Sequence, residues 1–146
     1  MPSFEYPFTL LGIHGVYNEK VYRPLVPIIV GSTKTARWQR FIALADSGAD
    51  ANLIPGGVTK ILGCAIKAGK PGGGATGIGG NMVPTWYHEL QVKLLSPDKL
   101  KEVWVGKPLE VECIEANSQV LLGTIGFLEN FKATFDYPNK KLILEL

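Results

Sequence analysis

Cysteine, histidine and aspartate are scarce in this chain of 146 residues, and their scarcity excludes several kinds of site. The two cysteines, Cys64 and Cys113, are too few to hold together a domain of this size. We interpret them as small buried hydrophobic residues in a reducing, cytoplasmic compartment. Both lie in strand-like sequence, which is not the setting of a catalytic thiol. His14 and His88 stand far apart and are expected to be structural, and no residues have the spacing of a metal site.

Long basic runs and long apolar runs are also missing. The net charge is only +2, and no cluster of Lys and Arg reaches about five residues, which argues against nucleic acid or an anionic membrane as a partner. No apolar run reaches the roughly 18 residues of a membrane span. The N-terminal sequence MPSFEYPFTLLGIHG lacks a basic segment and contains Glu5, so it does not resemble a secretory signal.

What the sequence does contain is typical of one domain built mainly from strands. Hydrophobic residues make up 46% of the chain, and 17 glycines with 10 prolines indicate many turns between short segments. Only FLENF (127–131) suggests a helix, of one or two turns. We therefore predict an all-β sandwich or barrel with one short helix near the C-terminus. No segment is repeated, so a site that needs two copies of a motif must take the second copy from another chain.

The strand-like runs also predict local pairing. LVPIIV (25–30) and RWQRFIALA (37–45) indicate a hairpin, with Pro27 restricting the first run to a sheet edge or a strand start. TWYHELQVKLL (85–95) alternates between two faces along its whole length. The remaining runs predict two more strand pairs, EVWV (102–105) with LEVECIE (109–115), and ATFDY (133–137) with KLILEL (141–146).

Seven glycines lie within GKPGGGATGIGGNM (69–82), which includes the spacing G-x-G-x-x-G at Gly72, Gly74 and Gly77. A dinucleotide site needs a helix directly after this motif, because the helix N-terminus binds the pyrophosphate. Here Pro84 and a strand-like run follow, and Pro71 stands where a P-loop has Ser or Thr. We therefore predict no nucleotide site. The stretch is either an ordinary surface loop or a hairpin that can hydrogen-bond an extended peptide through its main chain.

The stretch FIALADSGADANLIP (41–55) places an acid at the end of an apolar strand. An Asp-Ser-Gly tripeptide is commonly a simple turn, in which the aspartate caps its own backbone. Asp46, however, follows an apolar run and precedes another at Leu53 and Ile54. A carboxylate at the mouth of a buried strand is costly unless it is hydrogen-bonded or functional. By contrast, Asp98 in SPDK and Asp136 in TFDYP are expected in solvated turns.

Together these stretches resemble the retroviral-type, or retropepsin-like, aspartic protease family. ALADSGADANLI resembles the family's active-site loop, in which two apolar residues precede Asp-Ser/Thr-Gly-Ala-Asp, and Leu44 to Asp50 match it residue by residue. GIGG (77–80) resembles the flap tip, and VLLG (120–123) before FLENF resembles the strand-glycine-helix element. KATFDYPNKKLILEL (132–146) resembles the terminal hairpin of cellular and retroelement relatives. The four elements occur in the family's order and cover about residues 24–146.

The resemblance implies a closed, barrel-like all-β domain over residues 23–146 that works as a two-fold symmetric homodimer. It implies an aspartic endopeptidase with one Asp46 from each chain, no metal, no cofactor and an extended peptide or protein substrate. Ser47 and Gly48 would lock the two active-site loops across the axis, and the terminal strands of two chains would interleave. The substrate-binding residues that it implies are Ala49, Asp50, Gly77, Ile78, Gly79, Gly80 and Leu122, with Ile78 and Leu122 lining apolar subsites.

One departure from the family pattern keeps a second function open. After Gly123 the family usually has an arginine that braces the second aspartate of the loop, whereas this chain has Thr-Ile-Gly at residues 124–126. Asp50 is therefore expected to pair with Arg37 or Arg40, or to stay solvated. The alternative to an active protease is a retropepsin-like dimer that binds peptides or mediates assembly without cleaving them. An unrelated, monomeric β-barrel is a third alternative.

Residues 1–22 lie outside the resemblance. We expect them to form an N-terminal extension, which is either a strand that joins the dimer sheet or a removable leader. Self-cleavage near residue 20 is one way in which such a leader would be removed.

Overall fold

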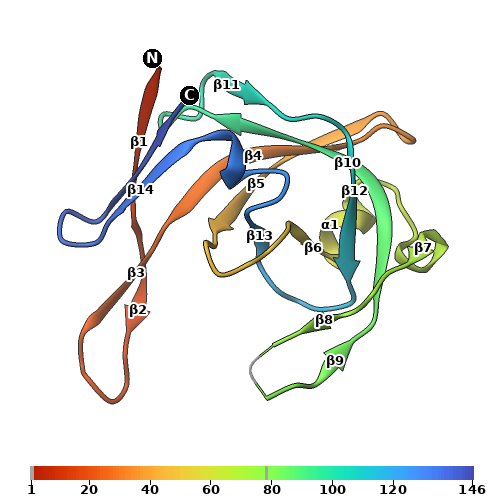
Figure 1. The fold of residues 1–146 in the computed structure, drawn as a ribbon, viewed down its shortest axis with the longest axis horizontal. Helices are drawn as coiled ribbons and strands as arrows, with labels where there is room; N and C mark the ends of the chain where they lie inside the picture. Colours follow the sequence, from red (N-terminus) through yellow and green to blue (C-terminus); the bar gives the residue numbers. More distant parts are fainter. Residues whose placement is uncertain (1, 78) are drawn as a thin grey trace.

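The structure, a computed structural model, describes residues 2–77 and 79–146 and consists mainly of β-strands (Figure 1). The main sheet contains β4 (Leu25–Ser32), β5 (Arg37–Ala45), β6 (Leu53–Pro55), β7 (Lys70–Pro71), β10 (Thr85–Leu95), β11 (Glu102–Val105), β12 (Leu109–Ile114) and β13 (Val120–Leu122). The other strands are β1 (Ser3–Pro7), β2 (Thr9–Ile13), β3 (Lys20–Arg23), β8 (Ala75–Thr76), β9 (Met82–Val83), β14 (Lys132–Asp136) and β15 (Lys141–Glu145). The helical segments are α1 (Gly56–Ile61) and two 3-10 turns, η1 (Ile66–Ala68) and η2 (Leu128–Asn130). The predicted all-β class is confirmed.

Six of these strands close into a barrel. Their order is β10-β12-β6-β13-β5-β4, and β4 pairs back onto β10. The predicted hairpin of β4 and β5 is confirmed, with a register from Leu25 opposite Leu44 to Ser32 opposite Arg37. Pro27 does not place β4 at a sheet edge. The ladder to β10 begins only at the next residue, Ile28, so the N–H that Pro27 lacks is not required there.

The longest strand, β10, forms much of the barrel wall. It pairs with β12 through its first half and with β11 near its end. The segment from β11 to β12, which we call the returning chain, therefore runs along one edge of β10. The prediction that β11 pairs with β12 is therefore wrong, because each of them pairs with β10. The returning chain is interrupted at Gly106, where a β-carbon would lie 2.7 Å from the Trp104 ring and 2.9 Å from the Val92 carbonyl oxygen.

The strands at the two chain ends form a separate sheet in the order β1-β15-β14. The predicted hairpin of β14 and β15 is confirmed. On its other edge β15 pairs with β1, and the buried Tyr6 of β1 donates a hydrogen bond from its hydroxyl to the Leu95 carbonyl oxygen (2.7 Å). The expected interleaving of terminal strands between two chains stays a prediction. Both edges of β15 are already satisfied within one chain, and Tyr6 ties β1 to the barrel core.

The α-helix lies at α1, directly after β6, and not near the C-terminus as predicted. The sequence of α1, GGVTKI, contains two glycines and has no side-chain cap, but Val58 and the following Leu62 are buried. The helix predicted at FLENF is only the turn η2. The turn ends before Phe131, whose backbone is extended, and β14 begins at the next residue, Lys132. In the described part of the chain no helix is long and apolar enough to cross a membrane.

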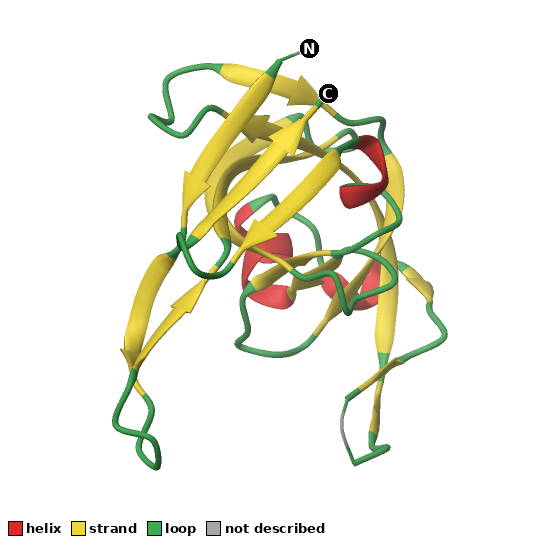
Figure 2. Ribbon diagram, turned by 60° about the vertical axis from the view of Figure 1, so that its left-hand side comes forward, coloured by secondary structure: helices red, strands yellow, loops and turns green. Residues whose placement is uncertain are grey.

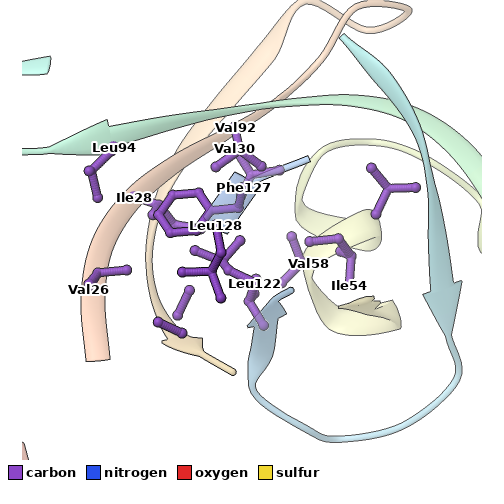
Figure 3. Close-up of a cluster of buried hydrophobic side chains, with 14 of the residues drawn as sticks. Val26, Ile28, Val30, Ile54, Val58, Val92, Leu94, Leu122, Phe127 and Leu128 are labelled. Atoms are coloured by element: carbon purple, nitrogen blue, oxygen red, sulfur yellow. The ribbon is translucent and has the colours of Figure 1, made fainter. Parts of the chain in front are cut away.

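The hydrophobic core fills the interior of the barrel. Alternate residues of β4 and β10 point inward and surround the fully buried ring of Phe127, as Figure 3 shows. Ile54 on β6, Leu122 on β13 and Val58 on α1 close the opposite side of this cluster (Figure 3). The core therefore fixes the ends of β5, β6 and β13, which are the strands that carry the candidate site.

Two β-hairpins project from the barrel at the end away from the chain termini (Figures 1 and 2). The first, which we call the arm (residues 9–23), is formed by β2 and β3. The second, which we call the flap hairpin (residues 74–83), contains β8 and β9. The arm carries five large apolar side chains that are at least 49% exposed, Leu10, Leu11, Ile13, Val16 and Tyr17.

Candidate active site

Asp46 lies where β5 ends and opens a tight loop, which we call the acid loop (residues 46–52). Its N–H donates to the Leu122 carbonyl oxygen (2.9 Å), which fixes the start of the loop to β13. Its carboxylate Oδ1 accepts a hydrogen bond from the Gly48 N–H (2.9 Å), and its carbonyl oxygen accepts one from the Ala49 N–H (3.1 Å). Asp46 is half-buried, so its carboxylate is oriented by the loop while remaining accessible.

The segment around Gly123 crosses the acid loop at very short range. The N–H groups of residues 124 and 125 donate to the carbonyl oxygens of Ala49 (3.0 Å) and Asp50 (2.8 Å). A β-carbon on Gly123 would lie 2.6 Å from the Ala51 carbonyl oxygen and 2.7 Å from that of Ala49, so only glycine permits this approach. The VLLG element thus braces the acid loop through backbone contacts.

Asn52, which none of the sequence motifs pointed to, completes this brace. Its side chain is 5% exposed, and its Oδ1 accepts a hydrogen bond from the Gly123 N–H (2.9 Å). A polar side chain between apolar neighbours, as in the sequence ANLI, is the signal that could have found it, because buried polar groups need partners.

The acid loop borders a cavity of about 780 Å³, which is within the range of about 300–1,000 Å³ typical of ligand-binding clefts. The acid loop forms one side, and residues 74–77 of the flap hairpin form another. Glu112, Leu53 and Leu121 complete the lining from three neighbouring strands. Glu112 and Leu121 each stand opposite Leu53 in the register, so their side chains share one face of the sheet.

Five of the predicted site residues line this cavity, namely Asp46, Gly48, Ala49, Asp50 and Gly77. Ser47 is exposed and lines a smaller cavity of about 110 Å³, together with Arg23 and Pro24 at the root of the arm. The acid loop therefore lies between the larger cavity and the arm.

The remaining predicted residues are placed differently. Gly79 and Gly80 are exposed near the tip of the flap hairpin, with φ of +102° and +76°, and are not in the cavity wall. Ile78 lies outside the described residues. Leu122 does not line a subsite, because it is 0% exposed and belongs to the barrel core. Its neighbour Leu121 lines the cavity instead, since adjacent side chains of a strand point to opposite faces.

Asp50 has neither of the arginine partners that the sequence suggested. Arg40 donates from Nη1 to the Lys99 carbonyl oxygen (3.1 Å), and Arg37 packs beside Gly63. Asp50 is exposed, and none of the ion pairs formed by residues 2–77 and 79–146 includes it. Of the predicted alternatives, a solvated Asp50 is the one observed.

The ionisable side chains among the described lining residues are all acidic, namely Asp46, Asp50 and Glu112. The negative charge of Glu112 is the main reason why the pKa of Tyr87 is raised, and partial desolvation and a weak hydrogen bond between the two side chains (3.4 Å) add to this effect. Within the described residues, no group of three or more His, Cys, Asp and Glu side chains is placed to hold a metal ion.

No protein-family model and no curated protein matches this sequence. Solved structures do match it. A crystal structure of a retropepsin-like aspartic protease from Rickettsia conorii aligns over 98% of this chain and 91% of that chain, with a TM-score of 0.58 and 16% sequence identity. The chain has the retropepsin-like fold. The EIAV protease complexed with the inhibitor HBY-793 also matches, with a TM-score of 0.41 and 17% identity over 69% of this chain and 81% of that chain.

The retropepsin-like fold brings together motifs that are far apart in the sequence. The acid loop, the flap hairpin and the Gly123 crossing all surround the same end of the barrel. Motifs that are separated along the chain therefore line or brace one cavity, and Asp46 places a carboxylate at its rim.

Proposed function

We propose that the protein is an aspartic endopeptidase, which hydrolyses peptide bonds with a pair of Asp46 carboxylates, one from each subunit of a homodimer. The observation that carries this proposal is the placement of Asp46. Its carboxylate is oriented by the Gly48 N–H and borders a cavity that the flap hairpin also lines. The shared fold with an aspartic protease from Rickettsia conorii supports the same conclusion.

A second subunit is needed because the chain contains only one Asp-Ser-Gly loop. Contact between identical surfaces around a two-fold axis brings two copies of one residue together. The surface beside the acid loop suits such a contact. Ile125, which forms an isolated bridge with Ala51, is 60% exposed although it is apolar.

The arm provides further apolar surface for a partner subunit. A lone two-stranded hairpin is marginally stable, and clustered exposed apolar side chains are typical of contact sites. The root of the arm at Arg23 lies beside Ser47 of the acid loop. A subunit that brings its own Asp46 to this loop would therefore lie within reach of the arm.

In the proposed mechanism the two Asp46 carboxylates share one proton, because like charges about 3 Å apart cannot both ionise. The ionised carboxylate takes a proton from a water molecule, which attacks the peptide carbonyl. The protonated carboxyl group donates a hydrogen bond to the carbonyl oxygen, and the pair then returns a proton to the leaving amine. Closure of the flap hairpin would exclude bulk water and strengthen these interactions.

The lining of the cavity indicates the kind of substrate. An extended peptide can hydrogen-bond to main-chain groups of the acid loop and the flap hairpin, in the manner of an added strand. Leu53 and Leu121 offer apolar contact, whereas Asp50 and Glu112 add negative charge. We therefore expect apolar residues next to the cleaved bond and a preference for Lys or Arg over Asp or Glu nearby.

A peptide-library cleavage assay between about pH 3 and 7 tests this proposal. Asp46→Asn should abolish cleavage while sedimentation still detects the dimer. Asp98→Asn, which changes an aspartate in a turn remote from the acid loop, should cleave as the unmodified protein does. Equal cleavage by Asp46→Asn would reject the proposal. A stable dimer that binds peptides at every pH without cutting them would favour the non-cleaving alternative.

A further inference from the structure

Thr85, the first residue of β10, follows the flap hairpin and binds the segment that enters it. Its carbonyl oxygen accepts a hydrogen bond from the Gly72 N–H (2.9 Å), and its hydroxyl oxygen accepts one from the Gly74 N–H (3.1 Å). The hydroxyl in turn donates to Oε2 of Glu112 on β12 (2.7 Å). Thr85 is only 3% exposed, so these contacts are largely shielded from water.

The direction of these hydrogen bonds depends on Glu112. A threonine hydroxyl has a single proton, and an ionised carboxylate can only accept. When the proton of Thr85 points to Glu112, the hydroxyl lone pairs are free to accept from the Gly74 N–H. Without Glu112 the hydroxyl loses its fixed acceptor and can rotate, so its lone pairs are no longer held toward Gly74.

The contact with Thr85 explains the glycine at residue 72, and the backbone conformation explains the glycine at residue 74. A β-carbon on Gly72 would lie 2.4 Å from the Thr85 hydroxyl oxygen and 3.4 Å from Oε2 of Glu112. Gly74 has a φ of +87°, which favours glycine, and β8 begins at the next residue. The chain therefore enters the flap hairpin directly from its contact with Thr85.

We propose that Glu112 is a positioning residue, which orients the Thr85 hydroxyl and thereby fixes the root of the flap hairpin at Gly74. Because Glu112 lines the same cavity as Asp46, this contact sets where the flap hairpin lies relative to the acid loop. The consequence for peptide cleavage rests on the proposed protease function, whereas the anchoring of Gly74 does not.

Amide hydrogen exchange, measured by NMR on the full chain, tests the anchoring directly. Thr85→Val keeps the side-chain shape without the hydroxyl, and Glu112→Ala removes the acceptor. Each should speed exchange of the Gly74 amide by about 2- to 10-fold, which is the effect of one ordinary hydrogen bond. Thr85→Ser and Glu112→Gln keep a hydroxyl and an acceptor, and should exchange at nearly the original rate. The Gly106 amide, which donates to the Val92 carbonyl oxygen away from the flap hairpin, is the control.

Peptide cleavage tests the positioning role. With an uncharged peptide, Thr85→Val should raise KM by about 2- to 10-fold and change kcat by less than about 2-fold, because the flap hairpin holds the peptide main chain while Asp46 performs the chemistry. Thr85→Ser should restore KM.

Unchanged Gly74 exchange in both Thr85→Val and Glu112→Ala would overturn the anchoring, and unchanged KM despite faster exchange would overturn the positioning role. If the unmodified protein cleaves no peptide, the proposed function fails, but Gly74 exchange still decides the anchoring.

Discussion

Gly123→Ala tests the close approach between the backbone at residue 123 and the acid loop. The substitution adds a single methyl group at this approach. The new β-carbon would lie 2.6 Å from the Ala51 carbonyl oxygen and 2.7 Å from that of Ala49. Both atoms belong to the backbone and cannot rotate away as a side chain can. A shift of the backbone at residue 123 would also weaken the hydrogen bond that its N–H donates to Oδ1 of Asn52 (2.9 Å).

The expected cost is at the upper end of the range for overpacking, about 3 kcal/mol. For a domain of this size each kcal/mol lowers Tm by about 2–4 °C, so Gly123→Ala should lower Tm by about 6–12 °C. Differential scanning calorimetry measures this change. Gly57→Ala is the matched control, because Gly57 lies in α1 and its added β-carbon meets no atom within 4 Å beyond the adjacent residues and the backbone of the helix. It should raise Tm slightly, since alanine favours a helix. A Tm for Gly123→Ala within about 2 °C of the unmodified protein would refute this reasoning.

Three other predictions concern the core, the thiols and the arm. Tyr6→Phe leaves a buried carbonyl without its donor and should lower the free energy of unfolding by about 1–3 kcal/mol in urea titrations; no change would mean that β1 is not tied to the barrel. Burial raises the pKa of the Cys113 thiol to about 12, so iodoacetamide at about pH 8 should label only Cys64 in the folded protein, and equal labelling of both would contradict this. Leu11→Lys with Val16→Lys should weaken the proposed dimer in sedimentation, and a dimer of unchanged strength would remove the arm from the interface.

Local patterns in the sequence predicted the parts of the fold that depend on neighbouring residues. The β4–β5 and β14–β15 hairpins follow from alternation and turn residues within short segments. The acid loop was identified because its aspartate ends an apolar strand within a specific motif. Composition alone left the glycine-rich stretch open between a surface loop and a hairpin, and the resemblance of GIGG (77–80) to a flap tip favoured the hairpin that β8 and β9 form.

The features that the sequence did not predict depend on contacts between distant segments. β1 pairs with β15 at the other end of the chain, and α1 is helical because Val58 and the adjoining Leu62 are buried, despite a sequence that is poor in helix-forming residues. Glu112 follows the alternation that turns it away from the core. No local pattern shows, however, that Thr85 and the flap hairpin lie against it. The resemblance implied Leu122 as a subsite residue, but Leu122 faces the core and its neighbour Leu121 lines the cavity.

The central claim is that Asp46 acts as one member of a pair contributed by two chains. A crystal structure of the protein with a non-cleavable peptide analogue would test this most directly. The account predicts two Asp46 carboxylates within about 3 Å of each other across a two-fold axis, facing the bound analogue. An active form in which the analogue lies against a single, unaccompanied Asp46, with the second copy many ångströms away, would contradict it.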